Sequence, residues 1–286
     1  MSPSPSMQSI PIRIAHKLMK TFATTRIGDI DVHYTIEGEG PWITLAHSLA
    51  CDSSMWDEQA DLLSKNYRVL RYDTRGHGQT SAPPGPYTLT QLADDVHGLF
   101  QHLGITRTHW MGISMGGMIG QTYALEHPGT IASLVLADTT SRRASNADVM
   151  WGERIAMAQA QGMSALVDGT LARWFTASFI ARQPEVVART ASGILATPVN
   201  GFCGCCAAIS KIDTLDRLHE ITCPVLVMVG EEDHGTPPAM ARQIHDHLPN
   251  SQFVLIKDAA HIANIEQPGV FNHALMAFMA QQKLIV

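Results

Sequence analysis

Short apolar runs and stretches with helical spacing alternate along most of the chain. The apolar runs predict strands over Thr21–Ile27, Ile30–Glu37, Trp42–Ala46, Tyr67–Tyr72, Thr108–Met111, Ala132–Ala137, Pro224–Val229 and Phe253–Ile256. Helical spacing is found over Trp56–Leu63, Leu89–Leu103, the residues after Ser114, Pro237–Leu248 and about Ile262–Gln282. Strands that alternate with helices of about 10–15 residues indicate a mostly parallel sheet with helices on both faces. We therefore predict an α/β fold with an eight-stranded sheet.

One long segment, between Thr139 and about Ala208, interrupts this alternation. Its strand signals vanish, and it is helical in spacing, rich in Ala and Met, and contains Trp151 and Trp174. A segment of this length is too long for a plain connection between two elements. The sequence therefore predicts a helical cap over 139–208, between core parts at 21–138 and 209–286, with 1–20 as an N-terminal extension.

Composition and charge narrow the class of protein. Of the 286 residues, 45% are hydrophobic and 16% are charged, which is typical of a globular enzyme and excludes a disordered chain. The net charge of −6 argues against nucleic acid or an anionic membrane as the main partner. No apolar run approaches the ~20 residues that a membrane helix needs.

The N-terminal stretch and the cysteines bear on the cellular compartment. Met1–Lys20 lacks the basic and then apolar order of a secretory signal, so it is either a loose extension or a segment that packs across the core. Five cysteines, three of them within Gly201–Cys206, are an odd number for a disulfide framework and offer no second separated pair for zinc. We expect buried, reduced thiols in a cytoplasmic protein that binds no metal.

The stretch Gly112-Ile-Ser114-Met-Gly116 joins a predicted strand to a predicted helix. A sharp corner at this point forces Ser114 into a strained backbone conformation, so the flanking side chains must be nearly absent. The hydroxyl then projects above the sheet edge at the N-terminus of a helix, where negative charge is stabilised. An ordinary glycine-rich turn is the plainer interpretation, but the strand before Ser114 and the helix after it favour a nucleophile.

A serine hydroxyl needs a base, usually a histidine that a carboxylate orients. His261 is the best candidate base, because it lies in a small-residue loop between the last strand and the last helix. Asp233 is the favoured acid, since it lies deep in the loop after Pro224–Gly230. Asp138, at the end of the preceding strand, is a rival for the same role, whereas we predict that His234 is incidental.

Acyl transfer also requires N–H groups aimed at a developing oxyanion. We assign one to the backbone amide of Met115, directly after the serine, and the second to that of Leu49, in the loop after the third strand. His47 and Ser48, in the same loop, either shape it by hydrogen bonding or have a purely structural role.

Together these motifs make the chain resemble the α/β-hydrolase superfamily, and within it the 3-oxoadipate enol-lactonases, from about Phe22 to the C-terminus. The segments that carry the resemblance are Ala46–Asp57, Gly112–Gly117, Met150–Ile155, Arg173–Thr176, Gly201–Ile209, Gly230–Pro238 and His261–Pro268. The superfamily orders its nucleophile, acid and base as Ser114, Asp233 and His261 occur here. The resemblance implies the α/β-hydrolase fold with an inserted helical cap.

The resemblance also implies that cap residues contact the substrate. The candidate substrate-binding residues are Ser48, Trp151, Arg154 and Trp174, although each tryptophan can equally belong to the cap core. Enol-lactonases usually have an arginine directly after the Ala-Ala-Ile run, where this chain has Ser210 and then Lys211. Arg154 and Lys211 therefore remain as partners for a substrate carboxylate.

These observations predict hydrolysis of a small ester or lactone through an acyl-enzyme, with no cofactor. Alternatives that use the same residues are a cofactor-free perhydrolase, a carbon–carbon bond hydrolase and an acyl-homoserine-lactone hydrolase. A ligand receptor on a hydrolase scaffold is the non-enzymatic alternative, whereas serine at position 114 disfavours haloalkane dehalogenation. The expected partner is a small molecule, and the sequence leaves the oligomeric state open, a homodimer included.

Overall fold

The structure is a computed structural model that describes residues 20–282, so the predicted N-terminal extension lies, apart from Lys20, outside the described residues. One sheet has the strand order β1-β2-β4-β3-β5-β6-β7-β8. Its strands are β1 (Thr21–Ile27), β2 (Ile30–Glu37), β3 (Trp42–Ala46), β4 (Arg68–Tyr72), β5 (Thr108–Ile113), β6 (Ile131–Ala137), β7 (Val225–Gly230) and β8 (Ser251–Ile256). Only β1 and β2 pair antiparallel to their neighbours, and the other pairs are parallel, which confirms the predicted sheet.

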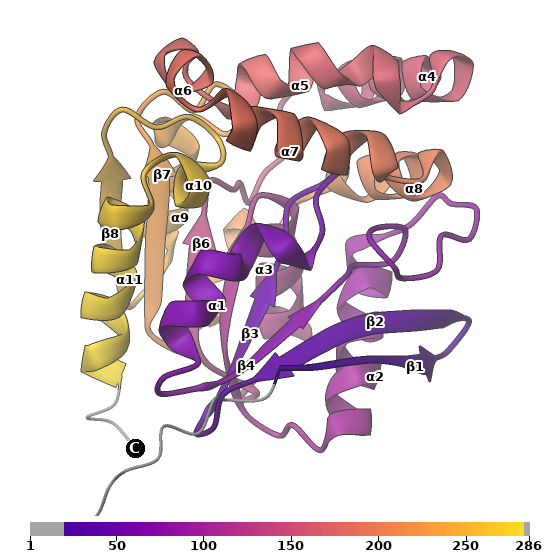
Figure 1. Cartoon of the computed structure of the whole chain (residues 1–286). Helices are drawn as coiled ribbons and strands as arrows, with labels where there is room; N and C mark the ends of the chain where they lie inside the picture. Colours follow the sequence, from indigo (N-terminus) through magenta and orange to yellow (C-terminus); the bar gives the residue numbers. More distant parts are fainter. Residues whose placement is uncertain (1–19, 283–286) are drawn as a thin grey trace, which may run out of the picture.

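Helices cover both faces of this sheet (Figure 1). α1 and α11 lie on one face, and α2, α3 and α9 lie on the other. The helices of this core are α1 (Asp57–Leu63), α2 (Leu89–Leu103), α3 (Met115–Glu126), α9 (Pro238–His247), α10 (Ala263–Glu266) and α11 (Pro268–Gln282), with short 3-10 helices η1 (Ser53–Trp56) and η3 (Leu215–Glu220). The predicted last helix is broken in two, because Pro268 has no N–H to donate and disfavours helical backbone at the residue before it.

The segment between β6 and β7 forms a separate layer of helices across one end of the sheet (Figure 1). We call it the helical layer, and it consists of α4 (Ala147–Gln161), η2 (Met163–Leu166), α5 (Val167–Trp174), α6 (Ala177–Arg182), α7 (Pro184–Ala196) and α8 (Val199–Ile209). We propose that this layer is the cap predicted over 139–208.

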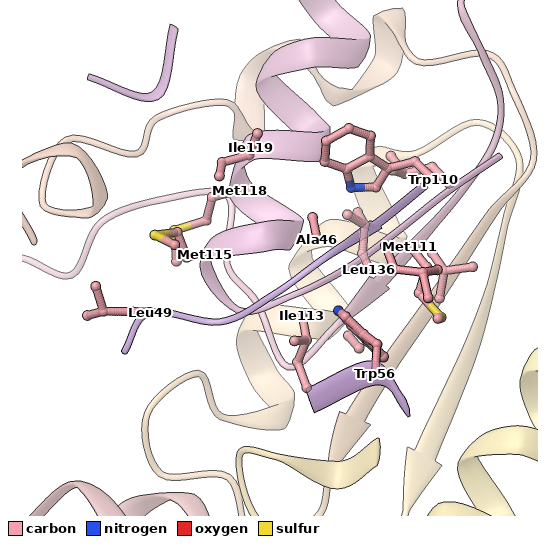
Figure 2. Close-up of a cluster of buried hydrophobic side chains, with 14 of the residues drawn as sticks. Ala46, Leu49, Trp56, Trp110, Met111, Ile113, Met115, Met118, Ile119 and Leu136 are labelled. Atoms are coloured by element: carbon pink, nitrogen blue, oxygen red, sulfur yellow. The ribbon is translucent and has the colours of Figure 1, made fainter. Parts of the chain in front are cut away.

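The centre of the core is built on β5, whose six residues are all buried. The Trp110 ring stacks on Tyr123 of α3, with ring centroids 5.9 Å apart, and its Nε1 donates a hydrogen bond to Gly116 O at 3.2 Å. A strand covered on both faces has no side that faces water, so the apolar Trp110, Met111 and Ile113 follow one another closely, and the polar Thr108 and His109 are buried in hydrogen bonds to Thr44 and Ser133. Figure 2 shows this part of the core, including Ala46 of β3, Met111 and Ile113 of β5, Met115, Met118 and Ile119 of α3, and Leu136 of β6.

No single helix among residues 20–282 has the length and hydropathy of a membrane span. Within the described residues, α7 and α8 reach this length and hydropathy only when they are counted as one segment, and their axes meet at 94°.

The corner between β5 and α3 depends on a close approach of two backbones. A Cβ atom on Gly116 would lie 2.1 Å from Ala46 O, at the end of β3. We expect Gly116→Ala to lower the free energy of unfolding by about 3 kcal/mol or more, because the clash is with backbone atoms that cannot rotate away. Urea denaturation followed by circular dichroism measures this loss.

Gly152→Ala is the matched control for that substitution. Gly152 also lies in a helix, α4, but nothing would come within 4 Å of an added Cβ. This variant should gain up to about 1 kcal/mol, because alanine has the higher helix propensity. Equal stability of the two variants would show that the corner tolerates a side chain.

Candidate active site

Ser114 occupies the single residue between β5 and α3. Its φ of 52° and ψ of −115° lie where a residue with a side chain is uncommon. Two hydrogen bonds hold this conformation: Ser114 N donates to Ala137 O at 2.9 Å, and Thr139 Oγ1 donates to Ser114 O at 2.7 Å. Both partners belong to β6 or directly follow it, so the neighbouring strand fixes the corner that directs the hydroxyl outward.

The three residues predicted to act together are in contact. His261 Nε2 lies 2.9 Å from Ser114 Oγ, and His261 Nδ1 lies 2.8 Å from Asp233 Oδ2. The His261 side chain is 9% exposed and that of Asp233 is fully buried. An imidazole so held offers one nitrogen to the hydroxyl and the other to the carboxylate, which is the geometry that general base catalysis by histidine requires.

Asp233 is held as an anion by its own loop. Thr236 Oγ1 donates to Oδ2 at 2.7 Å, while the amides of Gly235 and Thr236 donate to Oδ1 at 2.7 and 2.9 Å. Burial alone would raise the pKa of Asp233, but the charge and hydrogen bond of His261 and the hydrogen bonds from Thr236 outweigh it and lower the pKa to about 2. The carboxylate therefore stays ionised at any pH near neutral.

The rival acid, Asp138, makes different contacts. Its Oδ1 accepts a hydrogen bond from Gly230 N at 2.7 Å, and its buried Oδ2 has no hydrogen-bond partner among the described residues. Burial and the nearby charge of Asp233 raise the pKa of Asp138 well above its ordinary value. Asp138 thus ties the end of β6 to β7 in surroundings that favour the neutral form of its carboxyl group, and Asp233 is the carboxylate bonded to the histidine.

The loop that carries His261 is attached to the helical layer through Glu266. The buried Glu266 carboxylate accepts hydrogen bonds from Ala260 N at 2.8 Å and from Thr176 N at 3.0 Å, and also from Thr176 Oγ1. Ile262 N donates to Trp174 O at 3.2 Å. These hydrogen bonds hold the residues directly before and directly after His261.

One of the two amides assigned to an oxyanion belongs to the residue directly after Ser114, and the other belongs to Leu49, which lines the same cavity as Ser114. Met115 is the first residue of α3, where N–H groups have no partner within the helix. Ser48 N and Ala50 N donate to Met55 Sδ and His77 Nε2, at 3.3 and 3.0 Å. Leu49 N lies between them and has no acceptor among residues 20–282. Both amides are therefore available to a ligand.

A cavity of about 170 Å³ opens beside Ser114 and His261. The four predicted substrate-binding residues, Ser48, Trp151, Arg154 and Trp174, all line it. Lining residues that the sequence analysis did not predict as substrate contacts include Met118, Met150, Leu166, Thr170, Arg173, Phe202, Ile209, His234 and Thr236. His234, predicted to be incidental, thus lies in the cavity wall. The cavity is mostly apolar and of a size for a small molecule.

Two arginines of the helical layer give this cavity its charge. The Arg154 guanidinium lies 4.7 Å from the centre of the Trp151 ring, and Arg173 Nη2 donates to Thr170 Oγ1 at 3.3 Å. Neither forms an ion pair with a carboxylate in the described part of the chain. Burial and the charge of Arg154 lower the pKa of Arg173 to about 10, which is still well above neutral pH, and burial also lowers the pKa of Arg154.

Lys211, the other predicted carboxylate partner, lies elsewhere. Its Nζ is 2.6 Å from Asp148 Oδ1 in an exposed ion pair, and it does not line the cavity. The prediction for Lys211 is therefore wrong, because the turn that follows α8 places Lys211 beside Asp148, at the start of α4. Arg173 contributes the second cation instead.

Comparison with known proteins adds to this geometry. Residues 41–268 match a family described by the alpha/beta hydrolase fold. The chain is 34% identical to 3-oxoadipate enol-lactonase 2 of Acinetobacter baylyi, over 88% of this chain and 94% of that protein. Among solved structures, an enol-lactonase from Burkholderia xenovorans LB400 superposes with a TM-score of 0.87 at 38% identity, covering 90% of this chain and all of the other. A thermophilic esterase from Thermogutta terrifontis, solved with malate bound, gives 0.86 at 29% identity, covering 92% and 99%.

Asp138→Asn tests the protonation of this buried carboxyl group. In the unfolded chain the Asp138 carboxyl group ionises near its ordinary pKa of 3.8. Above that pH the wild-type protein must bind a proton when it folds, so its folded state becomes less stable as the pH rises. The amide takes up no proton. The stability of the variant relative to wild type should therefore increase with pH above about 4, by up to about 1.4 kcal/mol per pH unit.

Urea denaturation of both proteins across this pH range measures the difference in unfolding free energy. A difference that does not change with pH would mean that Asp138 is ionised in the folded protein.

Proposed function

Because the chain belongs to the α/β-hydrolase fold family, we propose that it is an ester or lactone hydrolase that works through an acyl-enzyme on Ser114. The observation that carries this proposal is the unbroken series of hydrogen bonds from Ser114 Oγ through His261 to Asp233. No cofactor enters the reaction that these three residues support.

In the first half of the reaction Ser114 Oγ attacks the substrate carbonyl carbon. His261 Nε2 takes the hydroxyl proton, and the Asp233 carboxylate stabilises the imidazolium that forms. The carbonyl oxygen becomes an oxyanion, which accepts hydrogen bonds from the amides of Leu49 and Met115. Collapse of this intermediate breaks the bond to the alkoxy oxygen, and His261 returns its proton to that oxygen.

In the second half water attacks the acyl carbon of the ester on Ser114. His261 now removes a proton from the water, and the same two amides hold the second oxyanion. This intermediate collapses with cleavage of the bond between the acyl carbon and Ser114 Oγ, and His261 returns the proton to Oγ as the carboxylic acid product leaves. A lactone differs from an open ester in one respect: its alcohol stays attached to the acyl chain, so a single hydroxy acid leaves the site.

We propose further that the substrate carries a carboxylate, bound by Arg154 and Arg173. A partly buried cation without a counter-ion gains most from an anionic ligand, because the ligand supplies the charge that the protein lacks. The relative named 3-oxoadipate enol-lactonase supports this substrate class, since closing one carboxyl group of such a diacid into a lactone leaves the other free. The cavity of about 170 Å³ admits a compact acid of this kind and excludes a polymer.

Substitution of the reacting groups tests the mechanism. We expect Ser114→Ala and Asp233→Asn to lower kcat by about 10⁴-fold or more, because the first removes the nucleophile and the second the anion that orients His261. The assay follows p-nitrophenol release from short p-nitrophenyl esters, with circular dichroism to establish that each variant is folded. Asp138→Asn is the matched control and should retain activity.

A panel of esters, lactones and a vinylogous diketone separates the alternatives. A wild type that leaves esters and lactones intact but cleaves the diketone is a carbon–carbon hydrolase, and one that turns over none of these substrates favours a ligand receptor. Either result would overturn the proposal.

Two matched esters test the role of the arginines. Mono-p-nitrophenyl glutarate and p-nitrophenyl pentanoate have the same leaving group and acyl length and differ in a terminal carboxylate. Arg173→Gln and Arg154→Gln should lower kcat/KM for the glutarate ester by about 10- to 100-fold, as expected for a lost charged hydrogen bond, and change it little for the pentanoate ester.

Arg182→Gln serves as the control, because Arg182 belongs to the helical layer but is exposed and does not line the cavity. Equal losses on both esters would assign Arg154 and Arg173 a structural role instead.

A further inference from the structure

The direction of the Leu49 N–H depends on the peptide group that it shares with Ser48. In a trans peptide the C=O and N–H point to opposite sides, so whatever fixes the carbonyl also fixes the amide. Ser48 O accepts a hydrogen bond from His47 Nδ1–H at 2.7 Å and another from Cys51 N at 3.2 Å. These two donors hold the carbonyl, and with it the direction of the Leu49 N–H.

The next peptide is held by a second histidine. Ala50 N donates to His77 Nε2 at 3.0 Å, and His77 comes from the loop after β4. Ala50 has a φ of 55°, a left-handed conformation that costs a residue with a Cβ about 1 kcal/mol or more. Loss of the bond to His77 would let this strained peptide relax and turn the Leu49 amide away.

Both rings are bound to the backbone through both of their nitrogens. Thr74 N donates to His47 Nε2 at 2.9 Å, and His77 Nδ1 lies 3.3 Å from Arg75 O. Because an amide donates to each Nε2, each ring must carry its proton on Nδ1 and be neutral. Burial lowers the pKa of His47, and burial together with the neighbouring His47 lowers that of His77 to about 3, so neither ring gains a proton near neutral pH.

We propose that His47 and His77 are positioning residues that lock the Ser48–Leu49 peptide with its N–H toward the oxyanion. The two rings lie side by side, with centroids 5.3 Å apart, and neither is exposed. Donation by His47 to Ser48 O also polarises that peptide, which strengthens its N–H as a donor. The inference rests on the proposed function, because it assigns a role in transition-state stabilisation.

Pairs of substitutions separate this role from simple packing. A glutamine amide reaches about as far as Nε2 of a histidine, and an asparagine amide about as far as Nδ1. His77→Gln keeps an acceptor for Ala50 N, and His77→Asn does not. His47→Asn keeps a donor for Ser48 O, and His47→Gln does not. Each pair therefore compares two buried amides that differ in whether the bond to the Leu49 peptide survives.

We expect His77→Asn and His47→Gln to lower kcat by about 10- to 100-fold with little change in KM, which is part of the ~10²–10³-fold loss when an oxyanion donor is removed. His77→Gln and His47→Asn should stay within a few-fold of wild type. The same two impaired variants should bind a trifluoromethyl ketone, whose adduct with Ser114 carries an oxyanion, more weakly by the same factor. Binding of a carboxylate product should not change.

Three results would overturn the inference: equal activity within each pair, loss of activity in proportion to thermal stability, or a rise in KM alone. If neither His77 variant folds, the His47 pair decides alone, since His47 bonds directly to the Ser48–Leu49 peptide. Failure of the proposed function looks different, because wild type itself would then show no turnover and form no adduct with the ketone.

Discussion

The whole site depends on one close approach, between the first turn of α3 and the end of β3. Added Cβ atoms on Gly112 and Gly116 would lie 2.2 Å from Gly116 O and 2.1 Å from Ala46 O. Only glycine allows backbones this near to each other. Ala46 leads into the loop of Leu49, and Gly116 follows Met115, so the same approach that forces the corner at Ser114 also sets the two amides proposed for the oxyanion.

The buried and partly buried arginines of this protein have two kinds of surroundings, with and without a carboxylate partner. In the core, Arg71 pairs with Glu37 at 2.6 Å and Arg75 pairs with Asp95 at 2.7 Å, and each arginine side chain is 3% exposed. In the cavity, Arg154 and Arg173 lack such partners. Leaving cations unpaired in a partly dry pocket costs stability, whereas pairing them with a ligand restores it. This contrast distinguishes arginines that brace the fold from those proposed to bind substrate.

The features that could be predicted from the sequence are those that depend on neighbouring residues. Periodicity predicted the eight strands and the mostly parallel sheet, and the corner motif pointed to Ser114, because strand, turn and helix preferences depend on residues close together in the chain. The choice between Asp138 and Asp233 could only be argued from position, since both follow strands that are adjacent in the sheet. Tertiary contacts distinguish the two residues: the hydrogen bonds from Thr236 and His261 stabilise the Asp233 anion, whereas burial raises the pKa of Asp138.

The cavity wall was harder to predict than the reacting groups. Lys211 was expected there and Arg173 was not, although both are cationic residues of the same region. The face that a helix of the helical layer turns toward the sheet depends on how these helices pack on one another. Their apolar residues do not mark one face clearly: α4 buries only Ala147 and Ala158 of its fifteen residues. Periodicity therefore carries little information at the positions that would select a substrate.

The proposed reaction and the proposed substrate selectivity belong to two parts of the chain that are joined by hydrogen bonds. The strand ends supply Ser114, Asp233 and His261, while the helical layer supplies the cavity arginines. Glu266 accepts hydrogen bonds from the His261 loop and from Thr176, between α5 and α6, so one buried carboxylate joins the loop of the proposed base to the helical layer. A change of substrate preference through the layer must then preserve these bonds, because the histidine proposed as the base is anchored to the part of the chain proposed to bind the substrate.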